Sequence, residues 1–77
     1  MNKKIRERLA VVEDSIRELA DEIENLAADE QDKFDNLTEG LQAADSGMRL
    51  EECADQLSNS AQSLFEVCAQ LAEVVEA

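Results

Sequence analysis

Residues 5–26 read IRERLAVVEDSIRELADEIENL, and the spacing of the apolar residues in this stretch decides the fold. Apolar side chains recur at alternating intervals of four and three residues, which is the heptad pattern of a helix that packs against another helix. The two sets of positions are Ile5, Val12, Leu19 and Leu26, and Leu9, Ile16 and Ile23. The pattern predicts a long helix that continues to about Phe34 or Asn36, with both sets in the seam against its partner.

A second heptad pattern occupies the other half of the chain. Four leucines repeat every seven residues, and four smaller residues with the same period lie beside them. The leucines are Leu50, Leu57, Leu64 and Leu71, and the smaller residues are Ala54, Ala61, Cys68 and Val75. Small residues at one core position let two helices approach closely, and Ala20 and Ala27 offer the same contact on the first helix. The pattern predicts a second helix from about Met48 to Val75.

The segment 36–47 between these helices is expected to reverse the chain. It contains both glycines, Gly40 and Gly47, which are common in turns. It also contains Asp45 and Ser46, either of which is suited to cap the next helix. The sequence therefore predicts an all-α fold, a single antiparallel helical hairpin over residues 1–77, with two long helices and a short reversal.

Apolar side chains are left over once one seam has been filled. Phe65, Val67 and Val74 lie on a strip of the second helix next to the leucines, and a two-helix hairpin of this size has only a shallow core. We therefore expect these three residues to form a subunit interface. The hairpin would then assemble into a four-helix bundle, as a homodimer, or into a larger homo-oligomer.

The charge is strongly negative and unevenly distributed. The chain has a net charge of −12 at pH 7, and residues 13–55 hold 15 carboxylates against three basic residues. Such a surface repels phosphate and attracts a basic protein surface, so direct DNA binding is not expected. The candidate partner-binding residues are Asp21, Glu22, Asp29, Glu30, Asp32, Asp35 and Glu39.

The first residues form a basic tip. Four basic side chains, which an oligomer would bring together in several copies, are candidates for holding a phosphate group: Lys3, Lys4, Arg6 and Arg8. The preferred interpretation is that they pair with carboxylates which a hairpin places at the same end. Those carboxylates are Glu66, Glu73 and Glu76.

Residues suited to catalysis or cofactor binding are scarce. The chain has no histidine, and adjacent carboxylates such as Glu51-Glu52 are typical of a solvated helix face. Cys53 and Cys68 would lie roughly 22 Å apart on one helix, too far for a disulfide within one chain, and are interpreted as small buried thiols. A disulfide between two chains of a dimer is the alternative. The sequence thus predicts a binding protein, not an enzyme, with no cofactor and no metal. It also predicts no signal peptide and no membrane span.

Residues 34–42, FDNLTEGLQ, resemble a segment of small acidic helical proteins encoded by bacteriophages and prophages. In that group a charged helix ends in a Phe/Tyr-x-Asn-Leu/Met-Pro-Glu-x-Leu-Gln segment, followed by a short polar stretch and another acidic helix. Thr38 stands where the group usually has proline. The residues that match are Phe34, Asn36, Leu37, Glu39, Leu41 and Gln42.

This resemblance implies a phage protein that acts in the host bacterial cytoplasm, where small proteins of this kind often modulate host machinery, including defence systems. The leading hypothesis is an inhibitor whose acidic surface mimics nucleic acid and binds a basic site on a host protein. A second hypothesis is an oligomeric sponge that sequesters a signalling nucleotide of host defence. A third is a structural or assembly helper of the phage.

Overall fold

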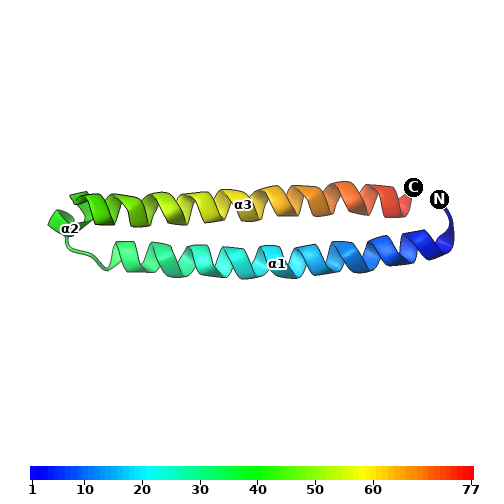
Figure 1. The fold of residues 1–77 in the computed structure, drawn as a ribbon, viewed down its shortest axis with the longest axis horizontal. Helices are drawn as coiled ribbons and strands as arrows, with labels where there is room; N and C mark the ends of the chain where they lie inside the picture. The colour runs from blue at the N-terminus through cyan, green and yellow to red at the C-terminus, as the bar shows by residue number, and fades with distance from the viewer.

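The computed structural model describes all 77 residues and shows a two-helix rod with a short helix at its turn. The elements are α1 (Lys3–Asp35), α2 (Glu39–Ala43) and α3 (Asp45–Glu76). Helices α1 and α3 run antiparallel along their whole length, and both chain termini lie at the end opposite α2 (Figure 1). The Cα atoms extend over 58 × 14 × 13 Å. The predicted all-α helical hairpin is thus confirmed.

The helix ends agree with the expected ranges except at the start of α3. Helix α1 begins after Asn2, whose side chain accepts a hydrogen bond of 2.9 Å from the backbone N–H of Ile5. Helix α3 begins at Asp45, three residues before the expected Met48, and its N-cap is Ala44, which makes no side-chain capping bond. The prediction that Asp45 or Ser46 caps α3 is wrong, because both residues already lie inside the helix.

The reversal is built without any glycine in a left-handed conformation. Neither glycine has a positive φ, and Gly40 lies within α2. Gly47 lies within α3 and is buried, because the backbone of α2 crosses directly over it. A Cβ atom at Gly47 would lie 2.9 Å from the Cα of Gln42. The glycine that matters here is therefore required for a close approach between two helices, and not for the turn itself.

Small residues form the buried core. The buried apolar residues are Ala20, Ala27, Ala54, Ala61 and Cys68. Because these side chains are short, the two helices approach closely, and the Sγ atom of Cys68 lies 3.6 Å from the backbone carbonyl oxygen of Glu13. The close contact predicted from the small residues is confirmed. None of the helices contains an apolar stretch that would span a membrane.

One of the two apolar sets of α1 lies outside this core. Ile5, Val12, Leu19 and Leu26, called here the Leu19 stripe, are between 46% and 56% exposed. The prediction that this stripe fills the hairpin seam is wrong. The alanine contact turns Ala20 and Ala27 towards α3, and a residue that directly precedes them lies about 100° around the helix. The other set, Leu9, Ile16 and Ile23, is half-buried beside the alanines.

Candidate functional site

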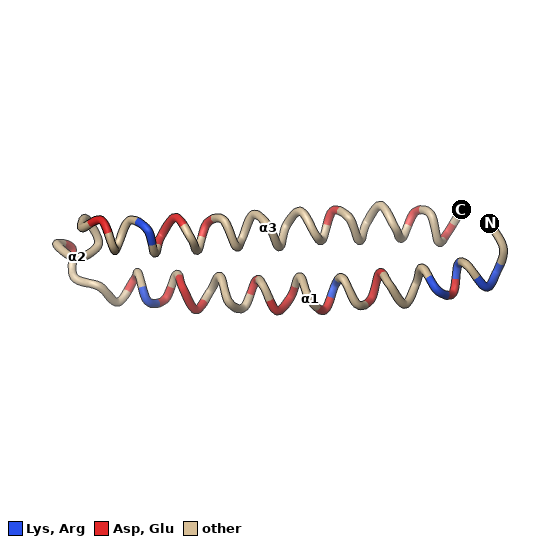
Figure 2. Tube along the Cα trace, viewed as in Figure 1, with Lys and Arg blue, Asp and Glu red and all other residues tan.

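Negative charge gathers at the turn end of the rod. Because α1 and α3 are antiparallel, the last two thirds of α1 lie beside the first part of α3, where most of the carboxylates are found (Figure 2). We call residues 13–55 the acidic end; they carry the 15 carboxylates and the basic residues Arg17, Lys33 and Arg49. The net charge of this segment equals the −12 of the whole chain, because the four basic residues and one carboxylate of residues 1–12 are balanced by the three carboxylates of residues 56–77.

Few of these carboxylates are neutralised by ion pairs. Arg17 pairs with Glu13 at 2.7 Å, and Lys33 pairs with Glu30 at 2.9 Å. The hydrogen bond that Arg17 donates to Glu13 raises the pKa of Arg17, and the one that Lys33 donates to Glu30 raises the pKa of Lys33. Both basic residues therefore keep their charge at neutral pH. No other carboxylate of the acidic end forms an ion pair, so its negative charge is available to a partner.

The seven partner-binding candidates surround the outer side of the rod at this end. All of them are exposed except Glu30, which is half-buried beside Lys33. Glu22 and Asp29 are seven residues apart and share one side of α1, whereas Asp21 and Asp35 share another. The candidates therefore form a surface that wraps around α1 and extends to Asp32 and Glu39, and not a single compact patch.

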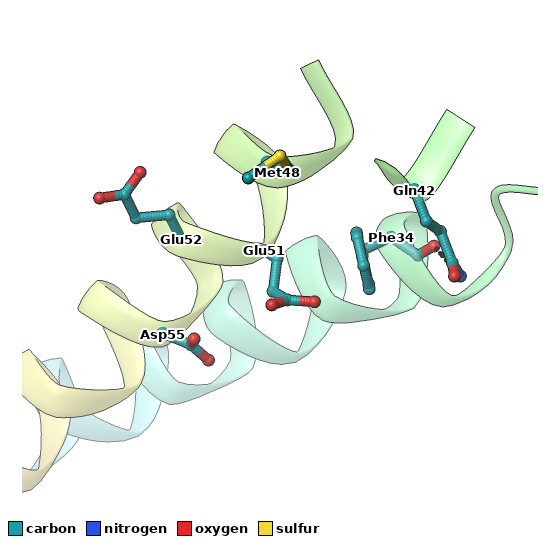
Figure 3. A pocket seen from close by; sticks show the side chains of 6 residues that line it. All are labelled: Phe34, Gln42, Met48, Glu51, Glu52 and Asp55. Carbon is teal, nitrogen blue, oxygen red and sulfur yellow. Dashed lines mark hydrogen bonds between the residues drawn. The ribbon is translucent and has the colours of Figure 1, made fainter. Parts of the chain in front are cut away.

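The structure adds a recess that the sequence did not reveal. It has a volume of about 310 Å³ and lies where α1, α2 and α3 meet. Its six lining residues are shown in Figure 3: Phe34, Gln42, Met48, Glu51, Glu52 and Asp55. The carboxylates of Glu51 and Asp55 lie one helical turn apart on the side of α3 that faces α1, whereas Glu52 extends away from the others (Figure 3).

This combination of side chains suits a basic side chain. Phe34 and Met48 provide an apolar wall for the methylene groups of a lysine or arginine, and two carboxylates provide the opposite charge. The sequence had suggested only a solvated face for Glu51-Glu52. One signal was available: Phe34 is one of only two aromatic residues, and it stands among carboxylates seven residues after Ala27.

The residues that carry the phage resemblance lie at the reversal. The side-chain amide of Gln42 donates a hydrogen bond of 3.1 Å to the backbone carbonyl of Phe34, and this joins the two ends of the segment. Thr38 caps α2, since its hydroxyl accepts a hydrogen bond of 3.4 Å from the backbone N–H of Leu41. No protein-family model, curated protein or solved structure matches the chain. The roles of these residues therefore come from their contacts in this structure.

At the opposite end, the basic tip is partly engaged. Arg6 donates a hydrogen bond of 2.8 Å to the backbone carbonyl of Ala77, and Lys3 lies 4.0 Å from Glu7. Lys4 and Arg8 are exposed, lie one turn apart and form neither a hydrogen bond nor an ion pair. The preferred pairing with carboxylates of α3 is wrong, because no ion pair joins the tip to that helix. The three carboxylates concerned are Glu66, Glu73 and Glu76.

The three interface candidates do not lie on one strip. Val67 and Val74 are 39% and 41% exposed, and their seven-residue spacing places them on one side of α3. Phe65 is half-buried and precedes Val67 by two residues, so it points to a different side of the helix. The cysteines also differ, because Cys68 is buried whereas Cys53 is exposed, and the expectation of two buried thiols is wrong for Cys53.

Proposed function

We propose that this protein is a non-enzymatic, phage-encoded inhibitor whose acidic end binds a basic surface of a host protein. It would occupy a site on that protein that normally binds nucleic acid. The observation that carries the proposal is the concentration of unpaired carboxylates along the last two thirds of α1 and at the turn end of the rod. The resemblance of residues 34–42 to phage proteins supports a phage origin and an anti-defence role. The negative charge supports binding by mimicry of nucleic acid.

The charge density is appropriate for a nucleic-acid mimic. The 23 residues of α1 from Glu13 to Asp35 span about 35 Å at 1.5 Å per residue. The net charge of −12 therefore corresponds to roughly one negative charge per 3 Å of rod, compared with one per 3.4 Å along a single nucleic-acid strand. A basic groove that follows a phosphate backbone would meet a similar linear density of negative charge on this protein.

The recess gives the acidic end a place for specific contact. A lysine or arginine of the partner would pack its methylene groups on Phe34 and Met48 and direct its charge to Glu51 and Asp55. Exposed rim charges mainly accelerate association and depend on salt, whereas a seated side chain slows dissociation. We therefore assign long-range attraction to the outer carboxylates and anchoring to the recess.

The proposal is tested by capturing partners from lysate of the bacterial host with two variants of equal charge. One variant removes three carboxylates from the acidic end (Asp29→Asn, Asp32→Asn and Asp35→Asn), and the other removes three from the opposite end (Glu66→Gln, Glu73→Gln and Glu76→Gln). We expect a nucleic-acid-binding protein to be captured at low salt by the wild type and by the second variant, but weakly by the first. Equal capture by both variants, or no such protein at low salt, would refute the proposal.

A second candidate function rests on the basic tip, where the exposed and unpaired Lys4 and Arg8 leave cationic groups for a phosphate. In this proposal an oligomer sequesters a signalling nucleotide without cleaving it. Calorimetry against a panel of cyclic nucleotides tests it, with Lys4→Gln/Arg8→Gln as the variant expected to abolish binding. An absence of heat with every nucleotide would exclude this function.

We also propose that the protein acts as a homo-oligomer. Its fully buried residues are all small, and the Leu19 stripe leaves four large apolar side chains about half exposed on a chain of 77 residues. A hairpin with so shallow a core gains stability when this stripe is covered.

A further inference from the structure

The exposed apolar residues of both long helices lie on the same face of the hairpin. Each member of the Leu19 stripe directly precedes a residue of the α1 seam, as Leu19 precedes Ala20 and Leu26 precedes Ala27. On α3, Val67 likewise directly precedes the buried Cys68. In two antiparallel helices that face each other, the position directly before the seam lies on the same side of both. The Leu19 stripe, Val67 and Val74 therefore form one apolar face.

Isolated apolar residues elsewhere on the rod do not belong to this face. Val11 is 65% exposed, but it lies on the outer side of α1, one residue before Val12 and about 100° away from it. Phe65 lies on the other side of α3 from Val67. A residue of the apolar face and its neighbour in the sequence therefore point to different sides of the rod. Substitutions at two adjacent residues can test the role of the face.

We propose that a second copy of this chain covers the apolar face, in a two-fold dimer whose two turn ends point in opposite directions. This inference rests on the proposed homo-oligomer and specifies its face, its orientation and its contacts. The side of the rod that carries the apolar face measures 58 Å by 14 Å between Cα atoms, roughly 800 Å², which is the size that stable protein interfaces typically bury on each partner. The apolar residues occupy part of this side, since Ile5 and Leu26 lie about 32 Å apart along α1. The resulting assembly is an antiparallel four-helix bundle.

Charge selects the orientation. If the two turn ends lay together, two segments that each carry a net charge of −12 would be side by side. Antiparallel packing instead places the basic tip of one copy beside the part of the acidic end of the other that lies next to its turn. Only the parts of the two acidic ends nearest the midpoint of α1, about residues 13–25, then remain side by side. Like charges held close together are unfavourable, so the antiparallel arrangement of the two copies has the lower electrostatic energy.

The seven-residue repeat fits this arrangement. When two copies of α1 cross antiparallel at their midpoints, Leu19 lies at the two-fold axis and faces Leu19 of the second copy. Val12 then lies opposite Leu26 of the second copy. At the edge of the same contact Arg8 comes beside Asp29 of the second copy, and symmetry repeats this pair. Three of the four residues of the Leu19 stripe thus meet apolar residues in this register, whereas Ile5 lies opposite Lys33 of the second copy.

The dimer is tested first with two adjacent valines. Val12→Asp places a charge on the apolar face, whereas Val11→Asp adds the same charge on the outer side. By light scattering at tens of micromolar, we expect the wild type and Val11→Asp to have twice the mass of one chain, and Val12→Asp to have the mass of one chain while circular dichroism shows its helices retained. A wild-type monomer, or a dimeric Val12→Asp variant, would overturn the proposal. If Val12→Asp loses its helices, the milder Val12→Ser takes its place, and it is expected to weaken the dimer at least tenfold.

The orientation is tested by oxidative cross-linking in a Cys53→Ser background. Leu19→Cys should form a covalent dimer, since the two copies of position 19 meet at the axis. Ile5→Cys should not, because its two copies would lie about 40 Å apart. Cross-linking at both positions or at neither would overturn the antiparallel arrangement of the two copies. Both experiments use this protein alone. A negative result for the dimer is therefore distinguishable from a failure of the acidic end to capture a host protein.

Discussion

The side-chain amide of Gln42 donates a hydrogen bond of 3.1 Å to the backbone carbonyl of Phe34, across eight residues of chain. The same carbonyl, in the last turn of α1, also accepts a hydrogen bond of 3.0 Å from the backbone N–H of Leu37, so the amide of Gln42 supplies its second bond. The same bond holds α2 against α1, and so it fixes one wall of the recess (Figure 3).

Replacing Gln42 with leucine should therefore destabilise the hairpin by about 1 kcal/mol, the usual cost of a lost hydrogen bond. Gln62→Leu is the matched control, because Gln62 is exposed in α3 and makes no side-chain hydrogen bond. Urea unfolding followed by circular dichroism compares the two variants. An equal loss of stability in both would show that the bond to Phe34 contributes nothing.

The two glycines should respond in opposite ways to alanine. At Gly47 the added methyl group would overlap the backbone carbonyl of Leu41 and lie 2.9 Å from the Cα of Gln42, so α2 has to move. We expect Gly47→Ala to cost about 1–3 kcal/mol of unfolding free energy. At Gly40 nothing lies within 4 Å of the added group, and Gly40→Ala should be neutral or stabilising by about 0.5–1 kcal/mol. Thermal melting of both variants would contradict this if Gly47→Ala melted at the wild-type temperature or above.

The alanine seam should not accept larger side chains. Ala61 is 1% exposed and belongs to the buried core of small residues between α1 and α3. Ala61→Leu should destabilise the hairpin by about 1–3 kcal/mol, because the helices have to separate to admit the extra atoms. Ala69→Leu, at an exposed position of the same helix, is the control and should leave the midpoint of denaturation almost unchanged. An unchanged midpoint for Ala61→Leu would show that Ala61 does not limit how closely the two helices approach.

Salt should change folding and binding in opposite directions. The net charge of −12 repels itself within the hairpin, and raising the ionic strength screens this repulsion, so the melting temperature should rise between about 0.01 and 0.15 M salt. Binding of a basic partner to the acidic end should weaken over the same range, because the attraction is screened as well. Melting curves and binding isotherms measured in the same buffers would contradict the proposal if the melting temperature and the affinity for the partner both rose or both fell with salt.

The heptad spacing was sufficient to predict the two long helices and the closeness of their packing, because these depend on periodicity and side-chain size, and the glycines and polar residues of segment 36–47 indicated where the chain reverses. It was not sufficient to choose between the Leu19 stripe and Ala20 as the inward position, since the two differ by one residue and both recur every seven. That choice depends on the distance between α1 and α3, which is set by the side chains of both helices together and not by the pattern of α1 alone. The recess was also beyond the sequence, since Phe34, Gln42 and Glu51 come from three elements whose arrangement depends on the contact above Gly47.

The seven-residue period of the alanine seam also makes the length of the rod adjustable. Removing one heptad from α1 and the facing heptad from α3 would shorten the molecule by about 10 Å while every remaining side chain keeps its direction. The turn and the chain ends would be untouched by such a change. Variation in length is thus compatible with this architecture in steps of one paired heptad, whereas a gain or loss of a single residue would rotate one half of a helix out of its contacts.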